Sequence, residues 1–167
     1  MIIDLKNLKL RVKDVEAYSL EKILSNKLLD TIYGRFLKPT LVQLTVERTG
    51  KLYLANGRIN TIIEVPCYRC LTNTTFPIDN GINFTLAESI HEEDYRGEDD
   101  IIFFTNPEVD ITPSVIENIF VNMPMRILCD DNCRGLCPEC GINKNLDTCN
   151  CKTDNIDPRL AKLKDLL

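Results

Sequence analysis

Cysteine is concentrated in one short part of this chain. Six of the eight cysteines lie between residues 129 and 151, and the other two, Cys67 and Cys70, form a separate Cys-x-x-Cys pair. Thiols at this density are normally held by metal ions or by disulfide bonds. The first residues carry charges throughout and have no apolar segment typical of a secretory signal, so we expect a cytoplasmic protein with reduced thiols. The cysteines therefore indicate metal binding.

The spacing of the cysteines predicts two metal sites with four thiolate ligands each. The sequence from Cys137 to Gly141 has the form of a zinc knuckle, a tight turn that aims two sulfurs at one ion. The tail site is predicted to use Cys137, Cys140, Cys149 and Cys151. The second site is predicted to join the early pair to the start of the tail, through Cys67, Cys70, Cys129 and Cys133.

A rival grouping of the same cysteines stays open at this point. It places one site on Cys129, Cys133, Cys137 and Cys140, and it leaves the other two pairs as reducible thiols. The first grouping predicts two Zn²⁺ ions per chain, and the rival predicts one. Iron in a rubredoxin-like four-thiolate site, which would serve electron transfer, is a further alternative.

No sequence pattern of a known catalytic centre is present. A zinc ion with four thiolate ligands has no open coordination position, so such sites stabilise a fold and do not bind substrate. The chain has no P-loop, dinucleotide-binding turn or hydrolase motif. Its single histidine, His91, lies in an acidic stretch with no apolar neighbours to fix its position. We therefore expect a protein that is not an enzyme and binds no small-molecule substrate.

The apolar pattern predicts an α+β fold. Residues 40–47, 51–55, 58–65 and 76–86 are rich in β-forming side chains and predict an antiparallel β meander, with a hairpin turn at Asn56-Gly57 and a break at Asn80-Gly81. A short helix is predicted near residues 19–29. A longer core helix is predicted from Thr112 to Met123, with Thr112 as its cap and Pro113 at its first position.

Composition divides the chain into a body and a tail. Residues 1–128 are predicted to form the mixed body, with a mobile acidic loop at about residues 88–100, and residues 129–167 the zinc-knuckle or ribbon tail. Asp157-Pro158 predicts a short C-terminal helix. No apolar run approaches the roughly 20 residues that span a bilayer, so no membrane partner is expected.

Charge limits the kinds of partner that this chain can bind. The formal net charge is −5, and residues 67–124 contain eleven Asp and Glu but only two Lys and Arg. Each zinc ion with four thiolates adds a further charge of −2. Bulk attraction to a nucleic-acid backbone is therefore disfavoured, and any RNA contact must come from a local basic patch.

The chain resembles the YceD-like family of large ribosomal RNA subunit accumulation proteins, in its cysteine-rich-tail subtype. The resemblance is carried by the strand that leads into Cys67-Tyr-Arg-Cys70-Leu71, by a core helix that ends in Met123-Pro124-Met125, and by the segments CRGLCPECGINKN and DPRLAKLKDLL. It implies a bacterial-type cytosolic protein that supports accumulation of large-subunit ribosomal RNA, and so ribosome assembly.

Two kinds of partner are consistent with such a role. The chain can bind ribosomal RNA precursor through a basic face, or a basic ribosomal protein through its acidic middle. A third possibility is a structural zinc-binding module of another cytosolic complex. The candidate partner contacts are Lys6, Lys9, Arg11, Lys13, Arg69, Arg134, Lys144, Arg159, Lys162 and Lys164.

Overall fold

The computed structural model describes residues 1–97 and 100–151. The chain divides into two compact units. Unit 1 consists of Met1–Val65 and Thr75–Met125, and unit 2 consists of Pro66–Thr74 and Arg126–Leu167. The short segment with the first Cys-x-x-Cys pair thus belongs to the same unit as the cysteine-rich tail. The predicted C-terminal helix lies outside the described residues.

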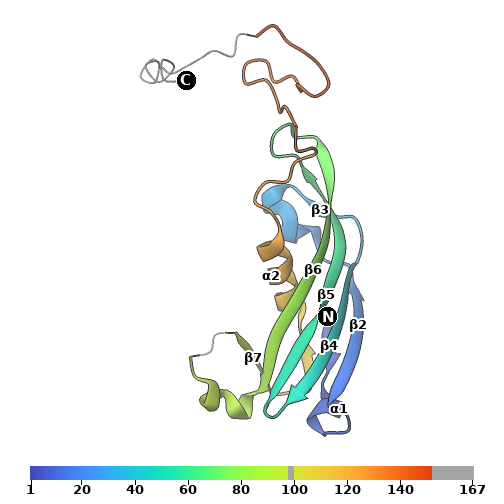
Figure 1. Ribbon diagram of the computed structural model, residues 1–167, viewed down its shortest axis with the longest axis vertical. Helices are drawn as coiled ribbons and strands as arrows, with labels where there is room; N and C mark the ends of the chain where they lie inside the picture. The colour runs from blue at the N-terminus through green and yellow to red at the C-terminus, as the bar shows by residue number, and fades with distance from the viewer. Residues whose placement is uncertain (98–99, 152–167) are drawn as a thin grey trace. The chain divides into compact units, whose positions relative to one another are not determined.

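Unit 1 is built on a six-stranded sheet (Figure 1). Its strands are β2 (Val15–Lys22), β3 (Arg35–Phe36), β4 (Thr40–Thr49), β5 (Leu52–Pro66), β6 (Asn73–Glu88) and β7 (Ile101–Phe104). The strand order is β2-β4-β5-β6-β7, and β3 also pairs with β5. Strands β2, β4 and β5 pair antiparallel, and the short strand β7 joins β6 in parallel. The predicted α+β class with a mainly antiparallel sheet is confirmed.

Shorter elements complete unit 1. They are β1 (Ile2–Asp4), α1 (Lys6–Lys9), the 3₁₀ helices η1 (Asn26–Ile32) and η2 (Ser89–Tyr95), β8 (Glu108–Asp110) and α2 (Thr112–Asn122). Strand β1 pairs antiparallel with β8, directly before α2 begins. None of the described helices is both long and apolar enough to cross a membrane.

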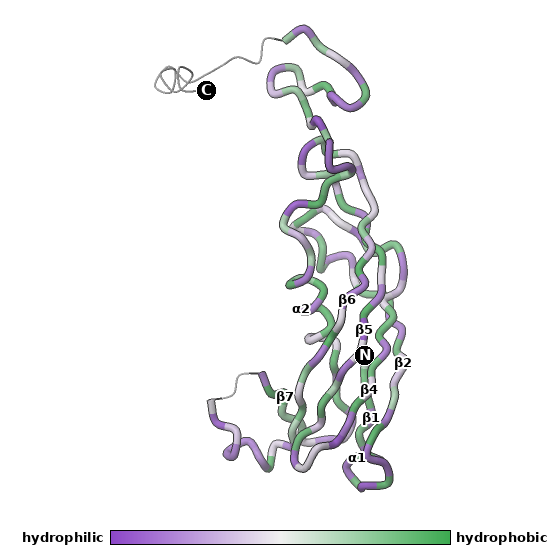
Figure 2. Tube along the Cα trace, in the orientation of Figure 1, coloured by the Kyte–Doolittle hydropathy of each residue, from purple (hydrophilic) through white to green (hydrophobic). Residues whose placement is uncertain are grey.

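The core of unit 1 follows the two-residue period of the strands. Val42, Leu44 and Val46 of β4 are buried, and the residues between them are exposed, so β4 turns one face to the core. The alternation between hydrophilic and hydrophobic residues along the strands is visible in Figure 2. Ile111, Val115 and Ile119 are buried on one side of the predicted core helix. Asn118 Nδ2 of α2 donates to Gly81 O of β6 at 3.1 Å.

The start of α2 differs from the prediction in one detail. Ile111, and not Thr112, occupies the N-cap position, and it makes no side-chain cap bond. The Thr112 N–H instead donates to Asp110 Oδ1 at 2.9 Å, so an aspartate two residues earlier satisfies this free amide. Pro113 consequently stands at the second helical position and not at the first, and its missing N–H costs nothing there either.

The predicted hairpin turn at Asn56-Gly57 was wrong. Strand β5 runs through both residues, and the turn that joins it to β4 lies at Gly50, whose φ of 66° suits glycine. The pattern before Asn56 was ambiguous because residues 52–55 are apolar on both faces of the strand. A Cβ at Gly57 would lie 1.9 Å from Gln43 O, so this glycine allows close approach of β4 and does not form a turn.

The short helix predicted near residues 19–29 was also wrong. Residues up to Lys22 form β2, which pairs with β4 over eight residues, and only Asn26–Ile32 is helical, as a 3₁₀ segment. The ladder of backbone hydrogen bonds to β4 outweighs the weak helical spacing of the leucines. In the acidic stretch, Ser89–Tyr95 forms η2, and Asp94 pairs with Lys51 at 2.8 Å.

The two Asn-Gly sequences offer a matched test of this fold. We expect Gly57→Ala to lower the free energy of unfolding of unit 1 by at least about 2 kcal/mol, because the new Cβ collides with the β4 backbone. Gly81→Ala is the control, since the nearest atom to its Cβ would be Gly57 O at 4.0 Å. Urea unfolding followed by far-ultraviolet circular dichroism measures both. Equal losses in the two variants would contradict the assigned strand register.

Candidate metal centres

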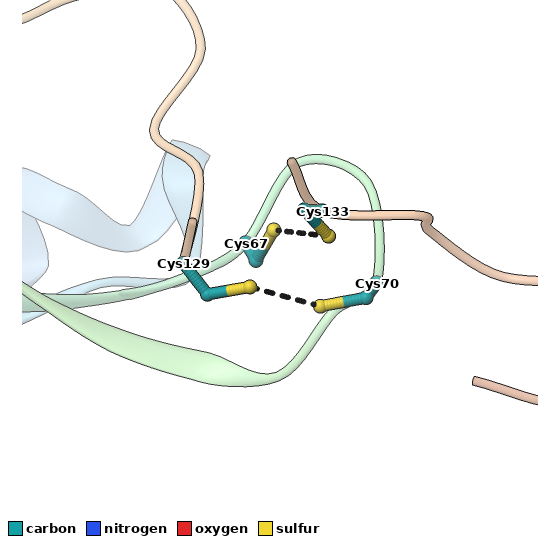
Figure 3. A group of neighbouring side chains, drawn as sticks. All are labelled: Cys67, Cys70, Cys129 and Cys133. Carbon is teal, nitrogen blue, oxygen red and sulfur yellow. Dashed lines mark hydrogen bonds between the residues drawn. The ribbon is translucent and has the colours of Figure 1, made fainter. Parts of the chain in front are cut away.

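The first cysteine quartet is assembled from two distant segments of unit 2. The sulfurs of Cys67, Cys70, Cys129 and Cys133 all lie within 4.8 Å of one another. Figure 3 shows Cys67 facing Cys133, with 3.8 Å between their sulfurs, and Cys70 facing Cys129 at 3.5 Å. A tetrahedral ion with metal–sulfur bonds of about 2.3 Å separates its ligands by about 3.8 Å, whereas a disulfide needs about 2.0 Å. The spacing therefore fits one metal ion.

A tight turn presents Cys67 and Cys70 to this site. The Leu71 N–H donates to Cys67 O at 2.9 Å, and the Cys67 N–H donates to Thr72 O at 2.8 Å. Leu71 has a φ of 60°, a left-handed conformation that lets the chain fold back after the second cysteine. Both sulfurs thus point to the same side of the turn.

Further hydrogen bonds join this turn to the cysteine-rich segment. Arg69 Nη1 donates to Cys133 O at 2.9 Å, and Arg69 O accepts from the Leu136 N–H at 3.1 Å. Gly135 lies so close that a Cβ there would be 3.0 Å from Arg69 O, and its φ is 70°. Arg69, predicted as a partner contact, therefore stabilises the turn by bonding its own chain.

A cation is needed for all four cysteines of the first quartet to ionise together. Cys67, Cys70 and Cys133 are buried and pack with Leu128 and Leu136. Burial opposes ionisation of Cys67, but backbone N–H groups of Cys70, Cys129 and Arg69 together lower its pKa to about 6. Hydrogen bonds to Cys70 and then Cys133 raise the pKa of Cys129 to about 12. Without a cation, one thiolate suppresses ionisation of the next, so the quartet takes its four-thiolate form only around a metal.

The second quartet repeats the same turn. The sulfurs of Cys137, Cys140, Cys149 and Cys151 lie within 4.8 Å of one another. The Gly141 N–H donates to Cys137 O at 2.9 Å, and the Cys137 N–H donates to Ile142 O at 2.8 Å, as in the first turn. Gly141, with a φ of 73°, takes the place that Leu71 has there. Backbone N–H groups of Cys140 and Glu139 lower the pKa of Cys137 to about 6.

The structure brings together the same two cysteine quartets that were predicted from the spacing. The rival set, with Cys129 and Cys133 beside Cys137 and Cys140, does not form among the described residues. All eight cysteines are free thiols, and either quartet can hold one metal ion. Four thiolates fill a tetrahedron, so neither site offers a position at which a substrate could bind.

Two polar residues that the sequence analysis missed support the first quartet. Cys70 Sγ and Thr72 Oγ1 form a hydrogen bond at 3.5 Å, and this contact lowers the pKa of Cys70 because the hydroxyl can donate to the thiolate. Asn145 Nδ2 donates to Cys133 Sγ at 3.2 Å, while its Oδ1 accepts from the Arg134 N–H at 2.7 Å. Thr72 follows its knuckle directly, and Asn145 lies in the polar loop after the other knuckle, so position next to a knuckle was the available signal.

Several predicted basic contacts are engaged within the chain. Lys9 pairs with Glu88 at 2.7 Å, and Lys13 pairs with Glu16 at 3.1 Å. Lys6 and Arg11 are exposed in unit 1, Arg134 is exposed and Lys144 half-buried in unit 2, and Arg159, Lys162 and Lys164 lie outside the described residues.

Unit 2 also contains an arginine–aromatic pair that was not predicted from the sequence. The Arg126 guanidinium lies 5.0 Å from the centre of the Tyr68 ring. Tyr68 is 62% exposed and follows Cys67 in the first knuckle. The alternation of aromatic and basic residues around Cys67-Tyr-Arg-Cys70 was the available signal.

Comparison with known proteins finds one matching family and several relatives. Residues 55–167 match the family described as large ribosomal RNA subunit accumulation protein YceD. The uncharacterized protein YlbN of Bacillus subtilis is 32% identical over 134 residues, which cover 80% of this chain and 77% of YlbN. The large ribosomal RNA subunit accumulation protein YCED homolog 1, chloroplastic, of Zea mays is 27% identical over 173 residues, covering 86% of this chain.

The lengths of these relatives differ from that of the chain. It spans 59% of the Zea mays protein. An uncharacterized protein of Mycobacterium leprae is 28% identical over 130 residues, or 77% of this chain and 59% of that protein. No solved structure matches the chain.

Metal content tests the two quartets directly. We expect the purified protein to bind two divalent ions per chain, and we expect Cys129→Ser/Cys133→Ser and Cys149→Ser/Cys151→Ser each to retain one, because the quartets share no ligand. Inductively coupled plasma mass spectrometry of the purified variants measures this. One ion in the unaltered protein, or none in either variant, would refute independent sites.

Removal of the metal should affect unit 2 alone. Its buried cysteines form the apolar cluster with Leu128 and Leu136, whereas unit 1 has a core of its own. With a strong chelator present, we expect amide hydrogen exchange to rise at least tenfold over residues 126–137 and to stay unchanged in β4. Readdition of metal serves as the control. Equal acceleration in β4 would mean that the metal stabilises unit 1 as well.

Proposed function

This chain belongs to the YceD family of large ribosomal RNA subunit accumulation proteins, and we propose that it supports accumulation of that RNA as a non-enzymatic assembly factor. The observation that carries the proposal is the family match over residues 55–167, a region that contains all eight cysteines. The cysteine quartets themselves are closed, which supports a role through surfaces and not through chemistry at the metal. We place this role in the cytoplasm, where thiols stay reduced.

We propose that zinc is the metal in both quartets. Ligand sets made only of thiolates suit Zn²⁺, which prefers the tetrahedral arrangement and has no redox chemistry. The knuckle amides that lower the pKa of Cys67 and Cys137 to about 6 favour the thiolate form that zinc needs. Zinc then serves to fold unit 2. A coloured protein with the charge-transfer absorption of iron–thiolate would replace this assignment with the rubredoxin-like alternative.

A basic ribosomal protein is the partner that the charges favour. The formal net charge is −5, and two four-thiolate zinc sites make the chain still more acidic. Lys9, Lys13, Lys51 and Arg58 each pair with a carboxylate of the chain itself, at 2.7, 3.1, 2.8 and 3.0 Å. These four cations are less available to phosphates, while an acidic surface attracts a basic protein over long range.

Direct binding of ribosomal RNA is the second candidate, and one feature favours it. Tyr68 is exposed, and Arg126 lies over its ring at 5.0 Å, a pair of planar groups on which an unpaired base can stack. If this surface binds RNA, Tyr68→Ser should weaken binding of single-stranded RNA, and the affinity should fall steeply with added salt.

The cellular test is depletion of the protein in its own host. We expect the ratio of large-subunit to small-subunit ribosomal RNA to fall at least twofold, and the unaltered gene to restore it. Cys67→Ser/Cys70→Ser should fail to restore it, because unit 2 cannot fold without its ligands. Quantitative electrophoresis of total RNA gives the ratio. An unchanged ratio after complete depletion would end the proposal.

A direct binding experiment separates the two kinds of partner. Affinity capture of the protein from cells, with and without nuclease treatment, is followed by identification of bound ribosomal proteins and RNA. Retention of a large-subunit protein after nuclease treatment supports the favoured partner. Loss of every ribosomal component with the RNA supports direct binding to ribosomal RNA instead.

A further inference from the structure

Unit 1 contains a groove that no element of the described structure fills. The groove has a volume of about 780 Å³ and runs between α2 and strands β5, β6 and β7. Ile82, Phe84, Ile102 and Val121 supply its apolar lining. Val121 is 75% exposed although it lines the groove, so this apolar surface is open to solvent. An occupant would gain by covering it.

One polar atom of a residue that lines the groove is an acceptor without a donor among the described residues. Asn118 donates through Nδ2 to Gly81 O, but its Oδ1 is buried and has no hydrogen-bond partner in the described structure. A buried carbonyl oxygen without a donor costs about 1–3 kcal/mol, so a ligand that supplies an N–H group recovers this energy. Asn118 lines the groove, so a ligand there can be that donor once the side chain rotates and exposes this oxygen.

Two carboxylates add negative charge at the same place. Glu117 and Asp100 line the groove and are exposed, and neither forms an ion pair with another described residue. Other acidic side chains of unit 1, such as Glu88 and Asp79, are instead paired with Lys9 and Arg58. The groove therefore offers negative charge, a free acceptor and an apolar lining together.

We propose that this groove binds a basic, extended segment of a partner protein, which would be the ribosomal protein of the proposed function if that function holds. An extended peptide projects alternate side chains to opposite sides and presents backbone N–H groups between them. Apolar side chains would cover Phe84, Ile102 and Val121, lysine or arginine would pair with Glu117 and Asp100, and a donor group would reach Asn118 Oδ1. A phosphate backbone is excluded by the same carboxylates.

The probe is a fluorescein-labelled hexapeptide of alternating arginine and valine, titrated with the full-length protein and followed by fluorescence anisotropy. We expect Asp100→Lys/Glu117→Lys to weaken its binding at least tenfold. The matched control is Asp30→Lys/Glu47→Lys, which makes the same change of net charge at exposed residues that do not line the groove. We expect the control to weaken binding less than threefold. Circular dichroism verifies that both variants fold.

Three outcomes would overturn the proposal. Equal weakening by the control would mean that bulk charge, and not the groove, attracts the peptide. Tighter binding of a single-stranded uridine oligonucleotide than of the peptide, strengthened further by Asp100→Lys/Glu117→Lys but not by the control, would assign the groove to RNA. Displacement of the hexapeptide by a synthetic peptide of residues 152–167 at equal concentration would assign it to the chain's own tail.

Different experiments refute the proposal for the groove and the proposed function. If Asp100→Lys/Glu117→Lys abolishes peptide binding but fully restores ribosomal RNA in depleted cells, the groove takes no part in that function, although the function stands. If depletion leaves the RNA ratio unchanged while peptide binding depends on Glu117 and Asp100, the groove is a site for another basic protein and the function is refuted.

Discussion

Sulfur atoms that converge from distant parts of the chain hold unit 2 together. Cys70 and Cys129 are 59 positions apart, yet their sulfurs are separated by 3.5 Å. Among the described residues of this unit, the buried apolar cluster consists of three cysteines with Leu128 and Leu136 packed around them. Thiolates at these distances repel one another unless a cation lies between them. We therefore expect the fold of unit 2 and metal binding at its quartets to be one equilibrium.

In each knuckle, backbone N–H groups favour the thiolate form of the first cysteine. In both turns the first cysteine accepts N–H groups at its sulfur and has a pKa of about 6, while the later cysteines Cys129 and Cys151 have raised pKa values. The thiolate charge therefore forms most readily on Cys67 and Cys137, the first cysteines of the two turns. We expect the distant ligands to complete the tetrahedron only when a metal ion replaces their protons.

Local signals in the sequence predicted the parts of the structure that local forces determine. The knuckles and the core helix follow from short spacings, so Cys137, Cys140 and the stripe Ile111, Val115 and Ile119 could be found without coordinates. The Asn56-Gly57 turn failed because strand pairing with β4 is a long-range contact that overrides a local preference. Thr72 and Asn145 could not be assigned either, since their roles depend on where two segments meet.

The sequence likewise does not show which charged side chains are already paired within the fold. This pairing determines which surfaces are available to a partner. A sequence gives the number of lysines and glutamates, but only the folded structure shows that Lys9 and Lys13 have carboxylate partners. Glu117 and Asp100 are not the only exposed carboxylates, and exposure alone would not distinguish them. They differ because they border an uncovered apolar surface and a buried oxygen without a donor. Since this surface belongs to unit 1 and the cysteine quartets belong to unit 2, the proposed partner site and the candidate metal centres use separate sets of residues.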